Sequence, residues 1–277
     1  MRNLRIIPRL DIKGSNLVKG INLEGLRIIG DPQFFAEKYY LDGADEIIYI
    51  DSVASLYGRN NLKDVVNKTA KKISIPLTVG GGLRSIEDIK LILKSGADKV
   101  AINTEAVKNP DFIKESVNYF GSSTIVLSIN YKSWPNDNFK KEKNLTVSST
   151  KEKDIKKWKN YFQVYTENGR QQSGLDAYDW ALMGQKLGVG EVLLTSIDCE
   201  GTQKGFELEL TQRLSKILSI PFIVCGGMGK KKDSKIIYEK TKCSAISLAS
   251  TLHYENLSIK ELKNYLNSEN IPIIIHE

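Results

Sequence analysis

Two short stretches of this chain read almost alike. IPLTVGGGLR, residues 75–84, and IPFIVCGGMGK, residues 220–230, each place a proline before a short apolar run that ends in a glycine cluster. Pro76 and Pro221 are 145 residues apart, and so are Gly81 and Gly226, which is just over half of the 277-residue chain. A repeat at that spacing indicates a duplicated architecture.

Apolar, β-branched runs of strand length alternate with amphipathic, lysine-rich runs of helix length along nearly the whole chain. This alternation is typical of parallel βα units. We expect strands at 5–11, 46–51, 76–80, 99–103, 124–130, 191–197, 221–225 and 244–249. We expect helices at 31–42, 60–72, 85–96, 110–119, 174–187, 208–218, 231–240 and 258–268. Eight such units predict a (β/α)8 TIM barrel, with a duplicated doubly wound sheet as the alternative.

Further matches extend the repeat over the chain. LKSGADKVAINT pairs with YEKTKCSAISLAS, which sets Thr104 against Ser250 at a separation of 146. RLDIK pairs with SINYK, which sets Asp11 against Asn130 at only 119. The second half therefore carries about 26 extra residues, and the polar stretch 134–160 is where we place them. We expect one barrel domain over residues 1–277, built from two half-barrels, with a long polar βα loop at about 134–160.

Composition excludes several classes of function. The formal net charge is +7, but the basic residues are spread over the expected helices with no aromatic-interleaved stripe, so we expect no nucleic-acid partner. No run approaches 18 uncharged apolar residues, and the first residues are charged where a signal peptide would be apolar. We expect a cytoplasmic protein that makes no membrane contact.

Cysteine and histidine are too few and too scattered for a metal centre. Cys199, Cys225 and Cys243 form no CxxC pair, and His253 and His276 are the only histidines. We expect no metal and no cofactor, and we interpret the three thiols as buried apolar groups.

Glycines stand where the chemistry of a (β/α)8 barrel takes place, at the carboxyl ends of its strands. One cluster could be a plain tight turn, but two related clusters predict a ligand with a phosphate at each end, bound by backbone N–H groups. The first set is Gly81, Gly82, Asn103 and Thr104, and the second is Gly201, Gly226, Gly227, Ala249 and Ser250.

Carboxylates at strand ends are the candidates for proton transfer. Asp11 and Asp51 end expected strands, Asp198 directly follows one, and each could instead cap the next helix. Asp11 stands opposite its repeat mate Asn130, and Lys19 follows in the next loop.

Four charged residues stand at the opposite ends of the strands. Arg5, Glu46, Lys99 and Glu191 each begin a strand or nearly so, which places charges of alternating sign around the barrel floor. From the residues alone, they form an ion-paired plug, because buried charges must be paired.

These motifs together resemble the cyclase subunit of imidazole glycerol phosphate synthase. RIIPRLDIK, LVKG, DEIIYIDSVAS, TVGGG, ADKVAINT, GEVLLTSID.EGT and CGGMGK appear in the family's order. The resemblance covers essentially the whole chain apart from residues 134–160.

The resemblance implies a specific chemistry. Ammonia from a glutaminase subunit, docked at the barrel floor as a heterodimer, passes through the barrel and attacks a bis-phosphorylated ribulosyl formimino carboxamide nucleotide. The products are imidazole glycerol phosphate and aminoimidazole carboxamide ribonucleotide. By this resemblance Arg5, Glu46, Lys99 and Glu191 match an ammonia gate, and Asp98 matches a position at the glutaminase interface.

The resemblance also assigns the mouth. The two glycine sets match two phosphate sites, Asp11 matches one of two catalytic aspartates, and we add Lys19, Asp51 and Thr195 to the substrate-binding residues. The second catalytic aspartate falls on Asn130, whose amide cannot exchange protons near neutral pH. Arg9 stands where the family has a cysteine.

These two departures leave alternatives open. The chain could be a paralogue that delivers ammonia in another pathway, such as amidino-sugar formation for cell-surface glycans, or a subunit that binds without catalysis. If it runs the histidine-pathway reaction, we expect slow turnover that Asn130→Asp would raise.

Overall fold

The computed structural model describes residues 3–54, 62–135 and 160–275. Eight parallel strands form a closed barrel, because β7 pairs with β10 as well as with β6. In order around the barrel they are β1 (Arg5–Lys13), β4 (Ile47–Asp51), β5 (Leu77–Gly80), β6 (Lys99–Ile102), β7 (Ile125–Pro135), β10 (Glu191–Ser196), β11 (Phe222–Cys225) and β12 (Ala245–Leu248). The predicted (β/α)8 barrel is confirmed.

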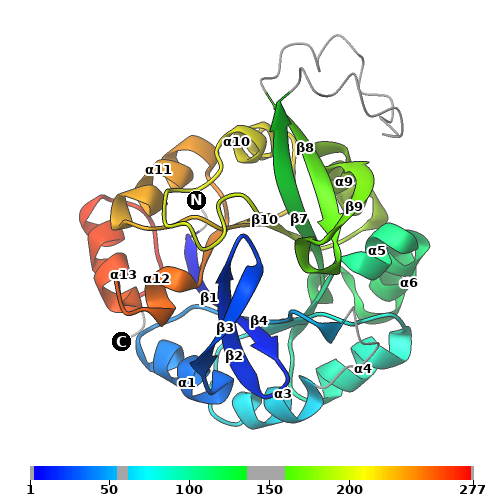
Figure 1. Ribbon diagram of the computed structural model, residues 1–277, viewed down its shortest axis with the longest axis horizontal. Helices are drawn as coiled ribbons and strands as arrows, with labels where there is room; N and C mark the ends of the chain where they lie inside the picture. Colours follow the sequence, from blue (N-terminus) through cyan, green and yellow to red (C-terminus); the bar gives the residue numbers. More distant parts are fainter. Residues whose placement is uncertain (1–2, 55–61, 136–159, 276–277) are drawn as a thin grey trace.

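Helices surround the strands as an outer ring (Figure 1). The eight that we expected are α1 (Pro32–Leu41), α3 (Leu62–Ala70), α4 (Ile86–Lys94), α6 (Asp111–Phe120), α9 (Ala177–Leu187), α10 (Glu209–Ser215), α11 (Lys231–Thr241) and α13 (Ile259–Ser268). Side chains that cap the first turn stabilise the start of several of these helices. The Ser85 hydroxyl accepts from the Asp88 N–H and the Asp88 carboxylate accepts from the Ser85 N–H, a capping box that opens α4.

Two apolar clusters hold the barrel together. The larger lies between the strands and the helices, and the smaller fills the barrel lumen. We call the smaller one the lumen cluster; it consists of Ile7, Ile48, Ala101, Val126, Leu193, Ile223, Cys225 and Ala245. Because side chains alternate along a strand, Arg5, Arg9 and Asp11 lie on the same lumen face of β1 as Ile7. The lumen is therefore charged at the floor, apolar above it and polar again at the mouth.

Two antiparallel ribbons at the mouth were not predicted from the sequence. They are β2 (Asn16–Ile21) with β3 (Glu24–Gly30), which continue from β1, and β8 (Asn160–Thr166) with β9 (Gln171–Asp176), which continue from β7. β3 and β9 are exposed or half-buried along most of their length, so they lack the alternation of buried and exposed residues that marks a strand. The ribbons follow corresponding strands of the two half-barrels.

Three smaller differences concern the ends of elements and two short helices. The helix expected at 174–187 begins at Ala177, because residues 174–176 belong to β9. Two short helices, α5 (Thr104–Lys108) and α12 (Ser250–His253), were not expected. The polar loop predicted at 134–160 begins within β7 and ends at the first residue of β8, and residues 136–159 lie outside the described residues.

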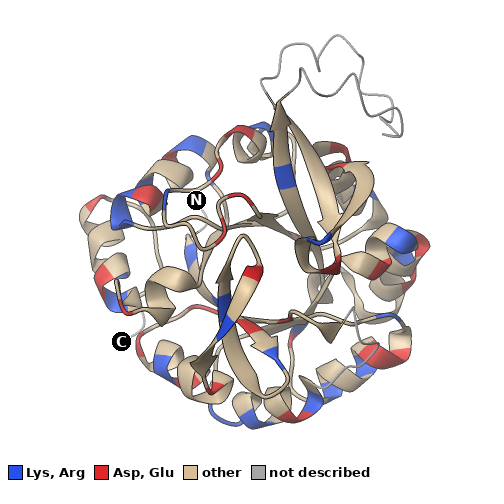
Figure 2. Cartoon of the chain, viewed as in Figure 1, with Lys and Arg blue, Asp and Glu red and all other residues tan. Residues whose placement is uncertain are grey.

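Both signs of charge are interspersed along the outer helices in the view of Figure 2. None of the helices in the described part of the chain combines the length and the apolar character needed to cross a membrane.

Candidate functional site

A pocket at the barrel mouth, which we call the first pocket, gathers the first predicted phosphate set. Asp51, Gly81, Gly82, Asn103 and Thr104 all line it. Gly81 and Gly82 have φ of 102° and 72°, a left-handed backbone that favours glycine. A Cβ on Gly81 would lie 2.5 Å from the Asp51 carbonyl oxygen, so a side chain there has no room. The loop can therefore present bare backbone to a ligand.

A second pocket gathers the second set. Gly201, Gly226, Gly227, Ala249 and Ser250 line it together with Glu200. Gly226 and Gly227 have φ of 98° and 106°, and a Cβ on Gly227 would lie 2.0 Å from the Gly205 carbonyl oxygen. This pocket is thus built from the same kind of close backbone approach as the first.

The two pockets are related by the internal repeat. Asn103 precedes α5 with φ −123° and ψ −81°, and Ala249 precedes α12 with φ −134° and ψ −83°. Each short helix follows the fourth barrel strand of its half, β6 or β12. The duplication read from the sequence is therefore repeated in backbone detail at the mouth.

Asp11 and Asn130 lie on opposite sides of the mouth. β1 and β7 are separated by three strands in either direction around the barrel. Both residues are buried, at 1% and 6% exposure, and Asn130 also lines the first pocket. The Asn130 Oδ1 atom has no hydrogen-bond partner among the described residues. It is an acceptor available to a ligand.

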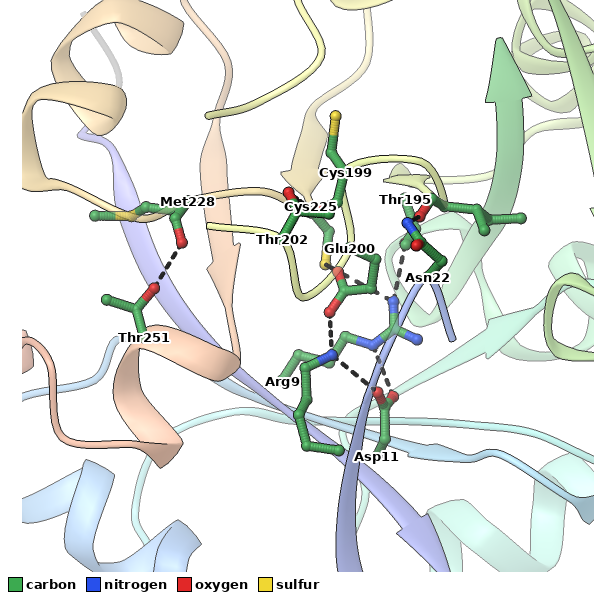
Figure 3. Close-up of polar contacts among 12 residues, drawn as sticks. Arg9, Asp11, Asn22, Thr195, Cys199, Glu200, Thr202, Cys225, Met228 and Thr251 are labelled. Carbon is green, nitrogen blue, oxygen red and sulfur yellow. Dashed lines mark hydrogen bonds and ion pairs between the residues drawn. The ribbon is translucent and has the colours of Figure 1, made fainter. Parts of the chain in front are cut away.

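Asp11 belongs to a buried ionic network, drawn in Figure 3. Arg9 Nε donates to Asp11 Oδ1 at 2.9 Å, and Lys19 Nζ lies 3.9 Å from Asp11 Oδ2. Lys19 also pairs with Glu200. Burial alone would raise the pKa of Asp11, but the charges of Arg9 and Lys19 outweigh it and hold that pKa below its ordinary value. Asp11 is therefore a carboxylate at neutral pH.

Of the other predicted residues of the mouth, Thr195, Asp51 and Asp198, only Asp51 lines one of the two pockets. Thr195 Oγ1 accepts from Arg9 Nη1 at 2.9 Å. Asp51 accepts from the N–H groups of Val53 and Ala54 at 2.9 Å each, which is the capping alternative, although it also lines the first pocket. The exposed Asp198 accepts from the Ser133 N–H at 2.7 Å, a bond that holds the backbone of β7 near its carboxyl end.

Sequence reasoning missed several residues at the mouth. Arg84 and Lys108 line the first pocket and bring positive charge to it. Glu200 lines the second pocket, and only its place before Gly201 in the sequence could have indicated it. The expectation of three buried thiols is wrong for Cys199, which is half-buried, while Cys225 and Cys243 are buried.

The four floor charges form one ion-paired ring. Arg5 pairs with Glu46 at 2.9 Å and with Glu191, and Lys99 pairs with the same two carboxylates at 2.9 and 3.2 Å. Arg5 and Lys99 are about one fifth exposed and line a pocket open at the floor. Asp98 is exposed beside them, and its carboxylate accepts from the Leu77 N–H at 2.8 Å.

Within residues 3–54, 62–135 and 160–275, no group of three or more His, Cys, Asp or Glu side chains could hold a metal ion. His253 is buried, and its Nδ1 lies 2.6 Å from the Tyr39 hydroxyl. Burial, aided by the charge of Lys19, lowers the pKa of His253 to about 4. The His253 imidazole is therefore neutral near pH 7, and its contact with Tyr39 is structural.

Comparisons with known proteins agree with this geometry. The family described as histidine biosynthesis protein matches residues 5–258. Imidazole glycerol phosphate synthase subunit HisF of Legionella pneumophila is 52% identical over 84% of this chain and 99% of its own length. Proteins of the same name from Clostridium botulinum strain Okra and Methanocaldococcus jannaschii are each 44% identical, covering 97% and 99% of this chain and 98% and 99% of their own lengths. The chain therefore belongs to the histidine biosynthesis protein family, as a HisF-type member.

Proposed function

We propose that this chain is the cyclase subunit of imidazole glycerol phosphate synthase. It uses ammonia to convert the bis-phosphorylated ribulosyl formimino carboxamide nucleotide into imidazole glycerol phosphate and aminoimidazole carboxamide ribonucleotide. The observation that carries the proposal is the pair of symmetry-related glycine pockets with Asp11 and Asn130 facing each other across the mouth. Such a mouth suits a ligand with a phosphate at each end.

The backbone N–H groups of the two pockets hold the phosphates, and Arg84 and Lys108 add positive charge to the first. Asp11 is the general base, because its carboxylate stays ionised. Asn130 accepts or donates a hydrogen bond but moves no proton. One group instead of two therefore transfers protons in this site.

Ammonia enters from the floor. A glutaminase subunit docks there as a heterodimer partner, over the open floor pocket and the exposed Asp98. The ring of Arg5, Glu46, Lys99 and Glu191 is the gate through which ammonia passes into the lumen cluster. The printed names of the relatives, each a synthase subunit, support an assembly of this kind.

The relatives also favour the histidine pathway over the paralogous synthase. Arg9 and Asn130 gave the sequence-based reason to consider another substrate, but the three relatives described above all carry the imidazole glycerol phosphate synthase name.

One assay tests the proposal. Purified protein is incubated with the bis-phosphorylated nucleotide and an ammonium salt at alkaline pH, without a partner. We expect both products to form in equal amounts, and Asp11→Asn to abolish their formation. Binding of the nucleotide without any turnover would contradict the proposal and favour the non-catalytic subunit.

A further inference from the structure

Arg9 crosses the barrel lumen just above the lumen cluster. It extends from the inner face of β1 and is only 1% exposed. Nε donates to Asp11 on the same strand, while Nη1 donates to Thr195 on β10 at 2.9 Å and contacts the Cys225 sulfur on β11 at 3.7 Å (Figure 3). Contacts on three strands fix the orientation of the guanidinium group.

The guanidinium group of Arg9 has one further nitrogen, Nη2, beside the two that donate to Asp11, Thr195 and Cys225. Among the described residues Nη2 has no hydrogen-bond acceptor, and Arg9 lines the first pocket with Asn130. Asn130 Oδ1 also lacks a partner, and no hydrogen bond joins the two side chains. The first pocket is therefore lined by a fixed guanidinium group with one nitrogen, Nη2, that lacks an acceptor and by a buried amide oxygen that lacks a donor.

The charge of Arg9 is permanent. Burial works to lower the pKa of Arg9, but Asp11, Cys225 and Glu200 raise it above the ordinary arginine value. Arg9 can therefore stabilise negative charge without giving up a proton. Asn130 cannot transfer a proton, and Arg9 provides a charge-stabilising group in the same pocket.

We propose that Arg9 is a catalytic residue whose Nη2 binds the ketone oxygen of the ribulosyl group, with Asn130 Oδ1 accepting an N–H of the incoming ammonia. This inference rests on the proposed function. The nitrogen–carbon bond forms as the carbonyl π pair moves onto oxygen, where the guanidinium stabilises the charge. Asp11 takes a proton from the nitrogen and returns it to that oxygen, giving a neutral carbinolamine.

Three substitutions test the role of Arg9. Arg9→Met removes the charge at similar length, Arg9→Lys keeps the charge without the planar fork, and Arg27→Met, at an exposed arginine of β3, is the control. We expect Arg9→Met to lower kcat with saturating ammonia about 10²–10³-fold, the usual effect of losing one oxyanion donor. KM for the nucleotide should change little, since both phosphate pockets remain, and Arg27→Met should match the native protein.

The pH profile separates catalysis from structural support. Without Arg9, the pKa of Asp11 should rise, so the acid limb of kcat/KM in Arg9→Met should move to higher pH than in the native protein. Thermal unfolding shows whether each variant is folded, and if Arg9→Met is not, Arg9→Lys carries the test with an expected smaller loss of kcat.

Native kcat in a folded but less stable Arg9→Met protein would overturn the inference and leave Arg9 as a lumen plug. A raised KM at unchanged kcat would also overturn it, because Arg9 would then bind substrate and transition state alike. Absence of turnover by the native protein is a different result, because it contradicts the proposed function itself.

Discussion

Arg9, Asp11, Lys19 and Glu200 are buried together at the mouth, each at most 2% exposed. Two are cations and two are anions, so the group is neutral as a whole. Removing one member leaves a neighbour buried and unpaired, which typically costs about 3–5 kcal/mol. Rate measurements on variants of these residues therefore need a stability measurement beside them.

The position of Arg9 in the first pocket changes the rate that we expect for Asn130→Asp. The sequence alone predicts faster turnover from the restored carboxylate, but in this pocket the new carboxylate would be attracted to the free Nη2 of Arg9. We expect Asn130→Asp alone to lower kcat, and Arg9→Cys/Asn130→Asp to exceed it by at least about tenfold, within the range for a positioned proton-transfer group. Steady-state kinetics of the two single variants and the double variant measure the coupling. Strictly additive effects would show that positions 9 and 130 do not interact.

His253 gives a pH-dependent contribution to stability. Its pKa is lowered to about 4 in the folded state, so between pH 6.5 and 4 the unfolded chain binds a proton that the folded chain does not. The unfolding free energy should therefore fall as the pH falls from 6.5 to 4, by about 3 kcal/mol from this residue. Urea unfolding of the native protein and of His253→Asn at several pH values measures this contribution as the difference between their unfolding free energies, which should change by that amount between pH 6.5 and 4.

Asp176 changes the unfolding free energy over a similar pH range but in the opposite direction. Burial raises the pKa of Asp176 to about 7, so its contribution to stability is lost as the pH rises from about 4 to 7. The relevant quantity is thus the difference between native protein and His253→Asn at each pH, from which the Asp176 contribution cancels. A difference that stays constant with pH would contradict the assignment.

At the level of elements, the barrel strands could be predicted because they are buried on both faces and read as short, continuous apolar runs. The outer helices could be predicted because each buries one face. The ribbons could not, since β3 and β9 have little buried surface to impose a pattern. The position of both glycine loops at the mouth was predictable, because a glycine cluster after a parallel strand is a local signal. The network around Arg9 was not, because Thr195 and Cys225 are 186 and 216 residues away in sequence.

A substitution at Gly226 tests whether the second pocket binds a phosphate of the nucleotide. With φ at 98°, a Cβ there would lie 2.7 Å from the Ser196 carbonyl oxygen, so Gly226→Ala must displace the loop. Gly43 has φ of 93° and open space around it, which makes Gly43→Ala a control for backbone strain alone. We expect both variants to lose about 1 kcal/mol or more of stability. Only Gly226→Ala should raise KM for the nucleotide, by about tenfold or more. An equal KM in both variants would place the second phosphate elsewhere.

At the scale of the whole molecule, the floor ring and the mouth are separate sites joined through the lumen cluster. Lys99 pairs with both ring carboxylates but is one fifth exposed, so its loss should cost only about 1–3 kcal/mol rather than the value for a dry ion pair. We expect Lys99→Met to lower the glutamine-dependent rate of the complex more than the rate with free ammonia. Lys90→Met, at an exposed position of α4, is the control. An equal fall of both rates would show that Lys99 is no gate.

The closed barrel also limits how copies of this protein can associate. Among the described strands only β3 and β9 have an edge with no neighbouring strand, and both belong to ribbons at the mouth. An unpaired edge is where another chain can add a strand. Strand addition at the edges of the described strands is therefore confined to the barrel mouth. Two copies joined in this way would cover each other's barrel mouths. A concentrated solution of the protein should therefore lose catalytic activity before the protein unfolds.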